Sequence, residues 1–160
     1  PTAWTTGCPR SPLTGMVSVK VEGDSAFIRG SETLAEEMLY NLIENGIRYN
    51  REGGTVSVRV SRRPAQAVDV VAFREEGAEG AIRELVEMRV SDTGPGVPEN
   101  MREKIFERFF RLDKSRSKET GGTGLGLAIV KHAVQYHHGV IAVEGKLGEG
   151  TTFVLMFPGA

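Results

Sequence analysis

Two neighbouring segments with different hydrophobic periods constrain the fold of this chain more than any other feature. Residues 36–50, EEMLYNLIENGIRYN, place apolar side chains every three or four positions, which is typical of an amphipathic α-helix. Residues 55–63, TVSVRVSRR, alternate apolar and polar side chains, which predicts a β-strand with one buried face. Because the two patterns follow each other across a short turn, the sequence indicates a mixed α/β layer fold.

The rest of the chain extends this pattern. Residues 16–30 alternate about a Gly-Asp turn and predict a first strand, and Ser31 is placed to cap a helix that runs to about Tyr49. Gly139 stands where the C-terminal cap of a later helix is expected. The remaining expected elements are strands over 68–73 and 84–92, a short helix from Pro98 to Phe110, an amphipathic helix over 125–138 and a hairpin over 140–158.

Length and composition indicate one domain of a larger protein. The chain has 160 residues and starts without a signal-peptide pattern, and we expect residues 1–15 to be a tail or linker and 16–160 to be the domain. The formal net charge of −1 provides no basic field, so no nucleic-acid partner is expected. The single cysteine, Cys8, excludes an intramolecular disulfide and fits a reducing compartment.

Two asparagines in the first helix need an explanation, because asparagine is a mediocre helix former. Asn41, Asn45 and Arg48 share one narrow stripe of the helix, which Leu34 and Met38 extend toward its start. One interpretation is a solvated helix edge. The other is a partly covered site in which two amide oxygens ligate a hard cation such as Mg²⁺.

The glycine run GGTGLGL, residues 121–127, leads directly into an apolar helix. Bare backbone N–H groups at the positive end of a helix dipole favour phosphate binding, whereas the alternative is a flexible linker. The run is no Walker A loop, because no Gly-Lys-Ser/Thr follows, and it does not match G-x-G-x-x-G.

The segment before this run, IFERFFRLDKSRSK over residues 105–118, is rich in phenylalanine and then in basic residues. Its cations, Arg111, Lys114, Arg116 and Lys118, would suit a lid that clamps a triphosphate. A solvated charge run is the alternative for each of them.

The stretch VSDTGPGV, residues 90–97, permits two interpretations of Asp92. Asp-Thr-Gly is the signature of an aspartic protease, but such an enzyme has no use for two strong helices and a second glycine cluster. Alternatively, Asp92 accepts a hydrogen bond from the exocyclic amine of a base, and Gly94 and Gly96 let the base approach the backbone. The neighbouring motifs favour the second interpretation.

Taken in this order, the motifs resemble those of the catalytic ATP-binding domain of bacterial sensor histidine kinases, a superfamily shared with type II topoisomerases, mismatch-repair ATPases and heat-shock chaperone ATPases. NLIENGIRYN resembles the N box, SDTGPGV the G1 box, IFERFFRLD the F box and GGTGLGLAIVKH the G2 box. The resemblance extends from Met16 to Pro158. It implies a two-layer α/β sandwich (the Bergerat fold), in which a mixed sheet packs on helices and a mobile ATP lid covers the nucleotide.

The resemblance also implies roles for individual residues. Asn45, with Asn41 beside it, would ligate Mg²⁺, and Asp92 would accept the adenine amino group with support from Thr151. Residues 114–121 would form the lid, and we expect 114–123 to be disordered without nucleotide. The full set of implied nucleotide contacts is Asn41, Asn45, Arg48, Tyr49, Asp92, Gly94, Gly96, Val97, Lys114, Arg116, Gly122, Thr123, Gly124, Leu125, Gly126 and Thr151.

The function implied is that of a histidine protein kinase. The domain would bind Mg·ATP and donate the γ-phosphate to a histidine on a separate dimerisation domain, for relay to the receiver domain of a response regulator. The parent would be a membrane-anchored sensor with this domain in the cytoplasm. A non-kinase ATPase of the same superfamily and a degenerate nucleotide-binding docking module are the alternatives.

Two features depart from the family pattern. The phosphoacceptor segment is absent, and we expect His132, His137 and His138 to be exposed residues near a helix end, so that the domain alone should bind ATP without phosphorylating itself. Residues 64–87 are longer and more acidic than the usual hairpin and are a candidate partner contact.

Overall fold

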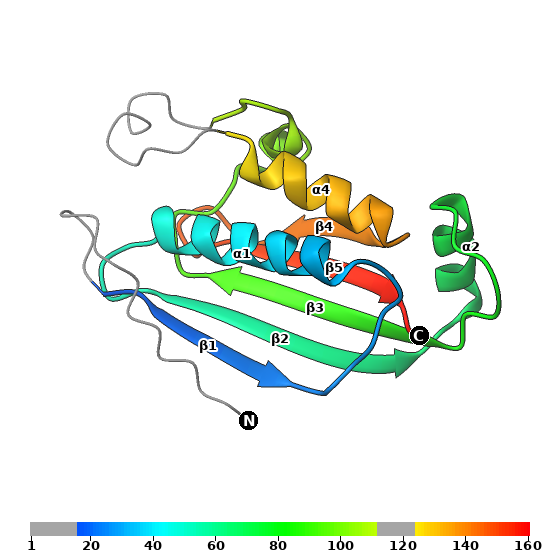
Figure 1. Ribbon diagram of the computed structural model, residues 1–160. Helices are drawn as coiled ribbons and strands as arrows, with labels where there is room; N and C mark the ends of the chain where they lie inside the picture. Colours follow the sequence, from blue (N-terminus) through cyan, green and yellow to red (C-terminus); the bar gives the residue numbers. More distant parts are fainter. Residues whose placement is uncertain (1–15, 112–123) are drawn as a thin grey trace.

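The computed structural model describes residues 16–111 and 124–160, which form two layers (Figure 1). One layer is a five-stranded sheet in the order β1-β2-β3-β5-β4. The other layer consists of α1 (Glu32–Arg48) and α4 (Gly126–Tyr136), which lie side by side on one face of the sheet. The expected two-layer α/β sandwich is confirmed.

The sheet is mixed, as expected. Its strands are β1 (Ser18–Gly23), β2 (Thr55–Pro64), β3 (Glu84–Asp92), β4 (Val140–Glu144) and β5 (Thr152–Pro158). β1 and β2 are parallel and are connected through α1, whereas the other pairs are antiparallel. β5, the last strand in the chain, lies between β3 and β4.

The main core lies between the sheet and the two helices. Val58, Val90 and Phe153 are opposite one another on adjacent strands and point toward the helices. Buried side chains from the other elements complete this core: Met38, Leu42, Val56, Ile105, Val130, Ala133, Val134, Leu155 and Phe157.

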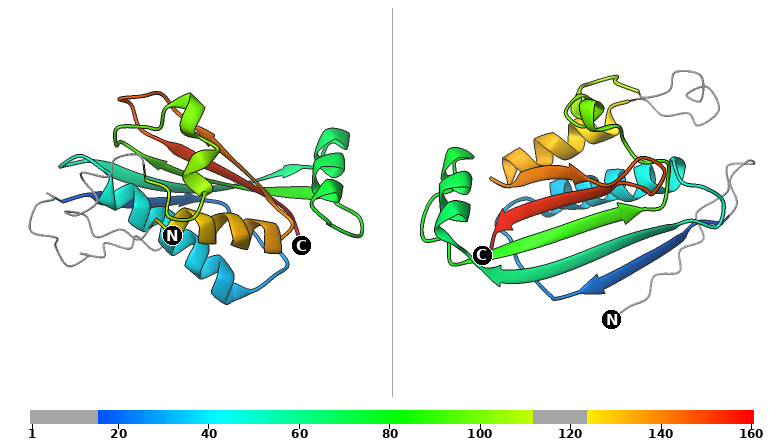
Figure 2. Two further views of the ribbon diagram at one scale, coloured as in Figure 1. Left: turned by 90° about the horizontal axis from the view of Figure 1, so that it is seen from above. Right: turned by 180° about the vertical axis from the view of Figure 1, so that it is seen from behind.

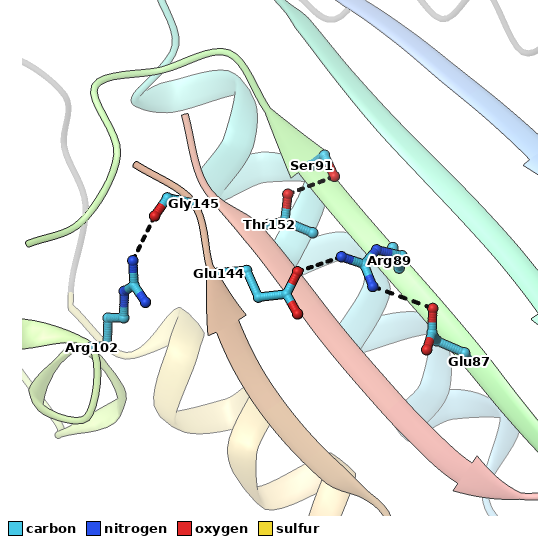
Figure 3. A network of polar contacts seen from close by, with 7 residues as sticks. All are labelled: Glu87, Arg89, Ser91, Arg102, Glu144, Gly145 and Thr152. Atoms are coloured by element: carbon cyan, nitrogen blue, oxygen red, sulfur yellow. Dashed lines mark hydrogen bonds and ion pairs between the residues drawn. The ribbon is translucent and has the colours of Figure 1, made fainter. Parts of the chain in front are cut away.

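The opposite face of the sheet is polar, and Figure 2 shows that no described helix covers it except at one end. Ser91 and Thr152 share a hydrogen bond there (2.9 Å), and Arg89 forms ion pairs with Glu87 and Glu144 (Figure 3). The period-two alternation of the strands thus separates an apolar face from a hydrated one.

The first helix begins and ends where the sequence predicts. The Ser31 hydroxyl accepts a hydrogen bond from the Leu34 N–H (3.3 Å), and Tyr49 follows the last helical residue. Gly46 lies so close to the sheet that a Cβ there would be 3.0 Å from Val56 Cγ2 and 3.5 Å from Asp92 Cβ. The helix therefore lies directly against the end of β3.

The expected strand over 68–73 is wrong, because these residues belong to the helix α2 (Ala67–Glu75). Asp69 accepts a hydrogen bond from the Gln66 N–H (2.8 Å) and so closes a capping box at the helix start. Arg63 holds the same carboxylate through two hydrogen bonds of 2.7 and 2.9 Å. The helix buries Phe73 in a second cluster with Ala78 and Leu85, at the end of the sheet.

The expected helix from Pro98 to Phe110 is also wrong. Two separate 3₁₀ turns, η1 (Glu99–Met101) and η2 (Lys104–Phe106), take its place. Phe109 has a φ of 62° and donates its N–H to the Gly124 carbonyl (2.9 Å). A continuous α-helix is incompatible with this left-handed residue and with the tie to Gly124.

The end of α4 differs from the expectation in two ways. The left-handed residue after the helix is His138 (φ 55°) and not Gly139, whose missing side chain makes room for the ring of Phe157 instead. His138 hydrogen bonds through Nδ1 to the Glu76 carbonyl (2.9 Å), which stabilises this backbone conformation. His132 and His138 are exposed as expected, but His137 is buried between α4, the start of α1 and β5.

None of the described helices is long and apolar enough to cross a membrane.

Candidate functional site

The carboxylate of Asp92 stands at the end of the central strand β3. Its Oδ1 accepts hydrogen bonds from the backbone N–H groups of Gly94 (2.9 Å) and Thr151 (3.4 Å). The Asp92 N–H donates in turn to the Thr151 carbonyl (2.8 Å), and Thr151 is buried. Among the described residues, no donor reaches Oδ2, so the backbone fixes one carboxylate oxygen and the other can accept from a ligand.

Burial raises the pKa of Asp92, and the N–H groups of Gly94 and Thr151 oppose this effect only in part. The Asp92 carboxylate, which is the hydrogen-bond acceptor of the site, therefore lies in surroundings that disfavour its negative charge. A hydrogen bond from a ligand to this carboxylate gains strength in such surroundings.

Three glycines lie around Asp92 at positions where any larger residue would collide with the backbone or with the carboxylate. A Cβ on Gly94 would lie 2.8 Å from the Tyr49 carbonyl oxygen and 2.9 Å from Asp92 Oδ1. One on Gly96 (φ 78°) would lie 2.6 Å from the Lys146 carbonyl oxygen, and one on Gly150 only 2.0 Å from that of Asp92. Gly94 and Gly96 of the motif, together with Gly150, thus let three backbone segments approach one another around one carboxylate.

A pocket of ≈ 330 Å³ opens beside this cluster, a volume suited to a small-molecule ligand. Its lining residues are Tyr49, Asn50, Arg51, Thr93, Gly94, Pro95 and Gly148. Tyr49 and Gly94 are among the predicted contacts. The other five lining residues were not predicted, although Thr93 and Pro95 lie inside the motif VSDTGPGV.

Asn50 and Thr93, which both line this pocket, belong to one hydrogen-bond network. The Thr93 hydroxyl donates to Asn50 Oδ1 (2.9 Å) and accepts from the Thr55 N–H (2.9 Å), and Asn50 Nδ2 donates to the Thr55 carbonyl (3.1 Å). These bonds join the end of α1 to the starts of β2 and of the loop after β3. No sequence motif predicts these hydrogen bonds, because they form only when the fold places the turn after α1 next to the end of β3.

Asn41, one of the predicted residues of α1, lies next to the start of α4. Asn41 donates from Nδ2 to the Glu37 carbonyl (2.8 Å), and its Oδ1 is 3.0 Å from the position that a Cβ on Gly126 would occupy. A larger residue at position 126 would displace the amide. The structure therefore brings Asn41 and the N-terminal end of α4 together, and whether either one contacts a nucleotide stays a prediction.

Arg48 has a partner that the sequence analysis missed. Its guanidinium donates to the carboxylate of Glu44, one turn earlier in α1, at 2.6 Å. The spacing of four residues is the signal that could have revealed this pair. Arg48 can contact a phosphate only by leaving or sharing Glu44.

A magnesium ion at this site would depend on amide oxygens. The described part of the chain contains no group of three or more His, Cys, Asp or Glu side chains that could hold a metal. Asn41 and Asn45 are both half-buried on α1 and offer two oxygens of the kind that Mg²⁺ accepts. Phosphate oxygens and water would have to complete its shell.

Several predicted contacts can be placed only in part. Val97 packs against the main core, Leu125 precedes α4, and Gly124 (φ 73°) lies against the backbone of Phe109. The remaining predictions lie outside the described residues: the lid over 114–121, the disorder over 114–123, and the contacts Lys114, Arg116, Gly122 and Thr123.

The chain is similar to known proteins in both sequence and structure. Residues 30–160 match the model of the family described as histidine kinase-, DNA gyrase B- and HSP90-like ATPase. The sensor-like histidine kinase SenX3 of Mycobacterium tuberculosis (strain ATCC 25618 / H37Rv) is 41% identical over 131 residues, which cover 82% of this chain and 27% of SenX3. The chain thus spans about a quarter of the length of this curated relative.

Two solved structures share the fold. The mycobacterial sensor histidine kinase MprB has a TM-score of 0.66 and 27% identity, and the match covers 89% of this chain and 82% of that one. Full-length ShkA in complex with AMPPNP has a TM-score of 0.65 and 29% identity, over 90% of this chain and 26% of ShkA.

Proposed function

Because the chain belongs to the histidine kinase-, DNA gyrase B- and HSP90-like ATPase family, as a catalytic domain of the sensor histidine kinase type, we propose that it binds Mg·ATP for transfer of the γ-phosphate to a histidine of a separate dimerisation domain. The observation that carries this proposal is the half-satisfied carboxylate of Asp92 among three glycines, beside an open pocket.

Adenine recognition follows from the two oxygens of Asp92. Oδ1 is held by the backbone N–H groups of Gly94 and Thr151, and Oδ2 accepts the hydrogen bond of the exocyclic amine. Gly94 and Gly96 let the base approach the backbone, and Tyr49, which lines the pocket, flanks it. Guanine presents a carbonyl where adenine has its amine, so the carboxylate rejects it.

The phosphates extend from this pocket toward α4. Gly124 and Gly126 bring backbone N–H groups to the start of that helix, where the helix dipole favours anions. Asn45 and Asn41 hold the metal, which neutralises phosphate charge when it is bound. Arg48 and, outside the described residues, Lys114, Arg116, Gly122 and Thr123 supply further contacts to the phosphates.

The proposed partners are parts of the signalling pathway that such a kinase serves. The phosphate acceptor is a histidine on a dimerisation domain of the same protein, and the next acceptor is the receiver domain of a response regulator. We propose that the parent is a membrane-anchored sensor with this domain on the cytoplasmic side. The role of this chain is then to position ATP, because the histidine itself lies elsewhere.

Two rival functions make different predictions. A non-kinase ATPase of the same family would hydrolyse ATP without a histidine acceptor. A degenerate module would either bind nucleotide without turnover or serve in docking alone and bind none. The 41% identity to SenX3 favours the kinase over both.

Calorimetric titration of AMPPNP with Mg²⁺ tests the first half of the proposal. We expect the wild type to bind and Asp92→Asn to lose at least about tenfold in affinity, as expected when one hydrogen bond to a charged group is lost. Asp24→Asn makes the same chemical change at an exposed position and should bind like the wild type. An Asp92→Asn variant that binds equally well would refute the assignment of the adenine site.

Radiolabelled ATP with a supplied histidine dimerisation domain tests the second half. We expect label on the supplied domain and none on the chain alone. Label on His132, His137 or His138 would contradict the proposal, and ATP hydrolysis without any transfer would favour the non-kinase ATPase.

A further inference from the structure

The turn between β4 and β5, residues 145–150, forms the outer wall of the Asp92 site. Its Gly148 N–H donates to the Pro95 carbonyl (2.7 Å), and Gly148 lines the pocket. The carbonyls of Lys146 and Gly150 lie close to Gly96, at 2.6 and 3.1 Å from the position of its missing Cβ. The loop that follows Asp92 is therefore packed against a turn that comes more than 50 residues later.

This turn is attached at its other end by one side chain. Arg102, in the segment between η1 and η2, donates from Nη2 to the Gly145 carbonyl (2.6 Å). Figure 3 shows the guanidinium reaching from that segment to the end of β4. The bond ties the segment after residues 93–97, the loop that follows Asp92 and is called the glycine loop below, to the start of the turn. The turn thus has a fixed partner at Gly145 as well as at Gly148.

The position of the Arg102 side chain lowers the stability of the folded protein. Its Nε is buried and has no hydrogen-bond partner among the described residues. A buried donor without an acceptor disfavours folding, so stability alone does not account for a long cationic side chain at this position. A requirement for the position of the turn does.

We infer that Arg102 is a positioning residue for nucleotide binding, which acts by holding the 145–150 turn against the glycine loop. The turn carries Gly148 on the pocket wall and leads directly into Thr151. The hydrogen bond from the Thr151 N–H to Asp92 Oδ1 is long, at 3.4 Å. A small outward movement would break this longer bond and open the pocket. Among the described residues, Arg102 has no hydrogen bond to any of those assigned to the nucleotide, and the inference rests on the proposed function.

The test compares Arg102→Met, which keeps the aliphatic stem and removes the donor, with Arg83→Met, which makes the same change at an exposed site far from the pocket. Two quantities are measured on each: hydrogen exchange of the Gly148 amide without nucleotide, and the affinity for AMPPNP with Mg²⁺. For Arg102→Met we expect exchange faster by about tenfold and affinity lower by a similar factor, the effect of losing one ordinary hydrogen bond. Arg83→Met should change neither, and exchange in β3 should stay slow in both.

Unchanged exchange in Arg102→Met would refute the attachment of the turn, and faster exchange with unchanged affinity would refute its role in binding. Arg102→Lys, which retains a donor, should recover part of both losses. If Arg102→Met fails to fold, Gly148→Ala tests the same wall, because its φ of 85° strains any side chain although no atom lies within 4 Å. It should weaken AMPPNP binding, and unaltered binding would refute the inference. A wild type that binds no nucleotide would refute the proposed function, whereas the exchange measurement would still test the attachment.

Discussion

The imidazole of His137 joins the end of α4 to the start of α1. Its Nε2 accepts a hydrogen bond from the Ser31 N–H (3.2 Å), and its Nδ1 donates to the Ala133 carbonyl (2.6 Å), which together define a neutral ring protonated on Nδ1. Gly30 makes the approach possible, because a Cβ there would lie 1.9 Å from His137 Cδ2. The two helices that carry the predicted nucleotide contacts are thus fixed to each other at the end away from the pocket.

We expect His137→Phe to destabilise the protein. Phenylalanine fits the aromatic contact with Phe157 but leaves the Ser31 N–H without its acceptor, which costs about 1–3 kcal/mol of unfolding free energy. Urea unfolding measures the loss. His132→Phe, at an exposed position of the same helix, should stay within about 0.5 kcal/mol of the wild type. Equal stabilities of the two variants would contradict the structural role of His137.

Asp92→Asn should stabilise the fold while it removes nucleotide binding. The amide oxygen can still accept from Gly94 and Thr151, and the buried charge is gone. We expect a gain of the order of 1 kcal/mol at pH 7, a usual size for a stabilising substitution. The remaining Nδ2 donor would face the adenine amine, so binding is lost for a reason unrelated to stability.

The pH dependence of this gain has a definite sign. Burial raises the pKa of Asp92, so the folded protein holds this proton more tightly than the unfolded chain. The cost of the charge is absent below the ordinary pKa of 3.8, grows as the pH rises, and is complete above the raised pKa. The stability difference between Asp92→Asn and wild type should therefore shrink on acidification, and a difference that grows toward low pH would contradict the burial of this charge.

Gly150→Ala should be far more damaging than Gly53→Ala. Both glycines have a positive φ, 116° and 71°, so both substitutions strain the backbone by about 1 kcal/mol or more. A Cβ at Gly53 would meet open space, whereas one at Gly150 would lie 2.0 Å from the Asp92 carbonyl oxygen. Thermal unfolding of the pair isolates this collision, and similar melting temperatures would show that the turn can move away from Asp92.

Asp69→Asn should loosen α2 without unfolding the domain. The Arg63 guanidinium and the Gln66 N–H lower the pKa of Asp69, so its contribution is present above the ordinary value of 3.8 and is lost as the pH falls through the lowered one. Asparagine keeps one oxygen for the Gln66 N–H but loses the charge and one of the two acceptors of Arg63, which we expect to cost about 1 kcal/mol or less. Hydrogen exchange should become faster in 67–75 only, with Glu79→Gln, an exposed neutralisation nearby, as the control.

The sequence predicted elements well where the hydrophobic period was strong. The helix α1 has a clear period of three to four residues, and the strands β2 and β3 have a period of two, whereas β5 is a short continuous apolar run, which is also typical of a buried strand. The expected strand over 68–73 rested on the β-branched and aromatic residues of VDVVAF, which are enriched in strands, whereas the capping bond to Asp69 and its ion pair with Arg63 stabilise the start of the helix α2.

The site was predictable as far as the motifs extend. Asp92 and Gly94 come from one motif, and the resemblance added Thr151, which the fold brings to the same carboxylate. The contact of Arg102 with Gly145 could not be foreseen, because its acceptor is a peptide carbonyl and any residue can provide one. The ion pair of Arg48 with Glu44, by contrast, has a signal in the sequence, because opposite charges four residues apart on a helix are neighbours.

The central position of β5 has a consequence for synthesis on the ribosome. β4 has β5 as its partner in the sheet, and β3 has one open edge until Thr152–Pro158 arrive. Phe153, Leu155 and Phe157, which fill much of the main core, belong to this last strand. A nascent chain that ends before residue 152 therefore has both helices but no complete surface to pack them on, and native structure can form only after β5 has left the exit tunnel.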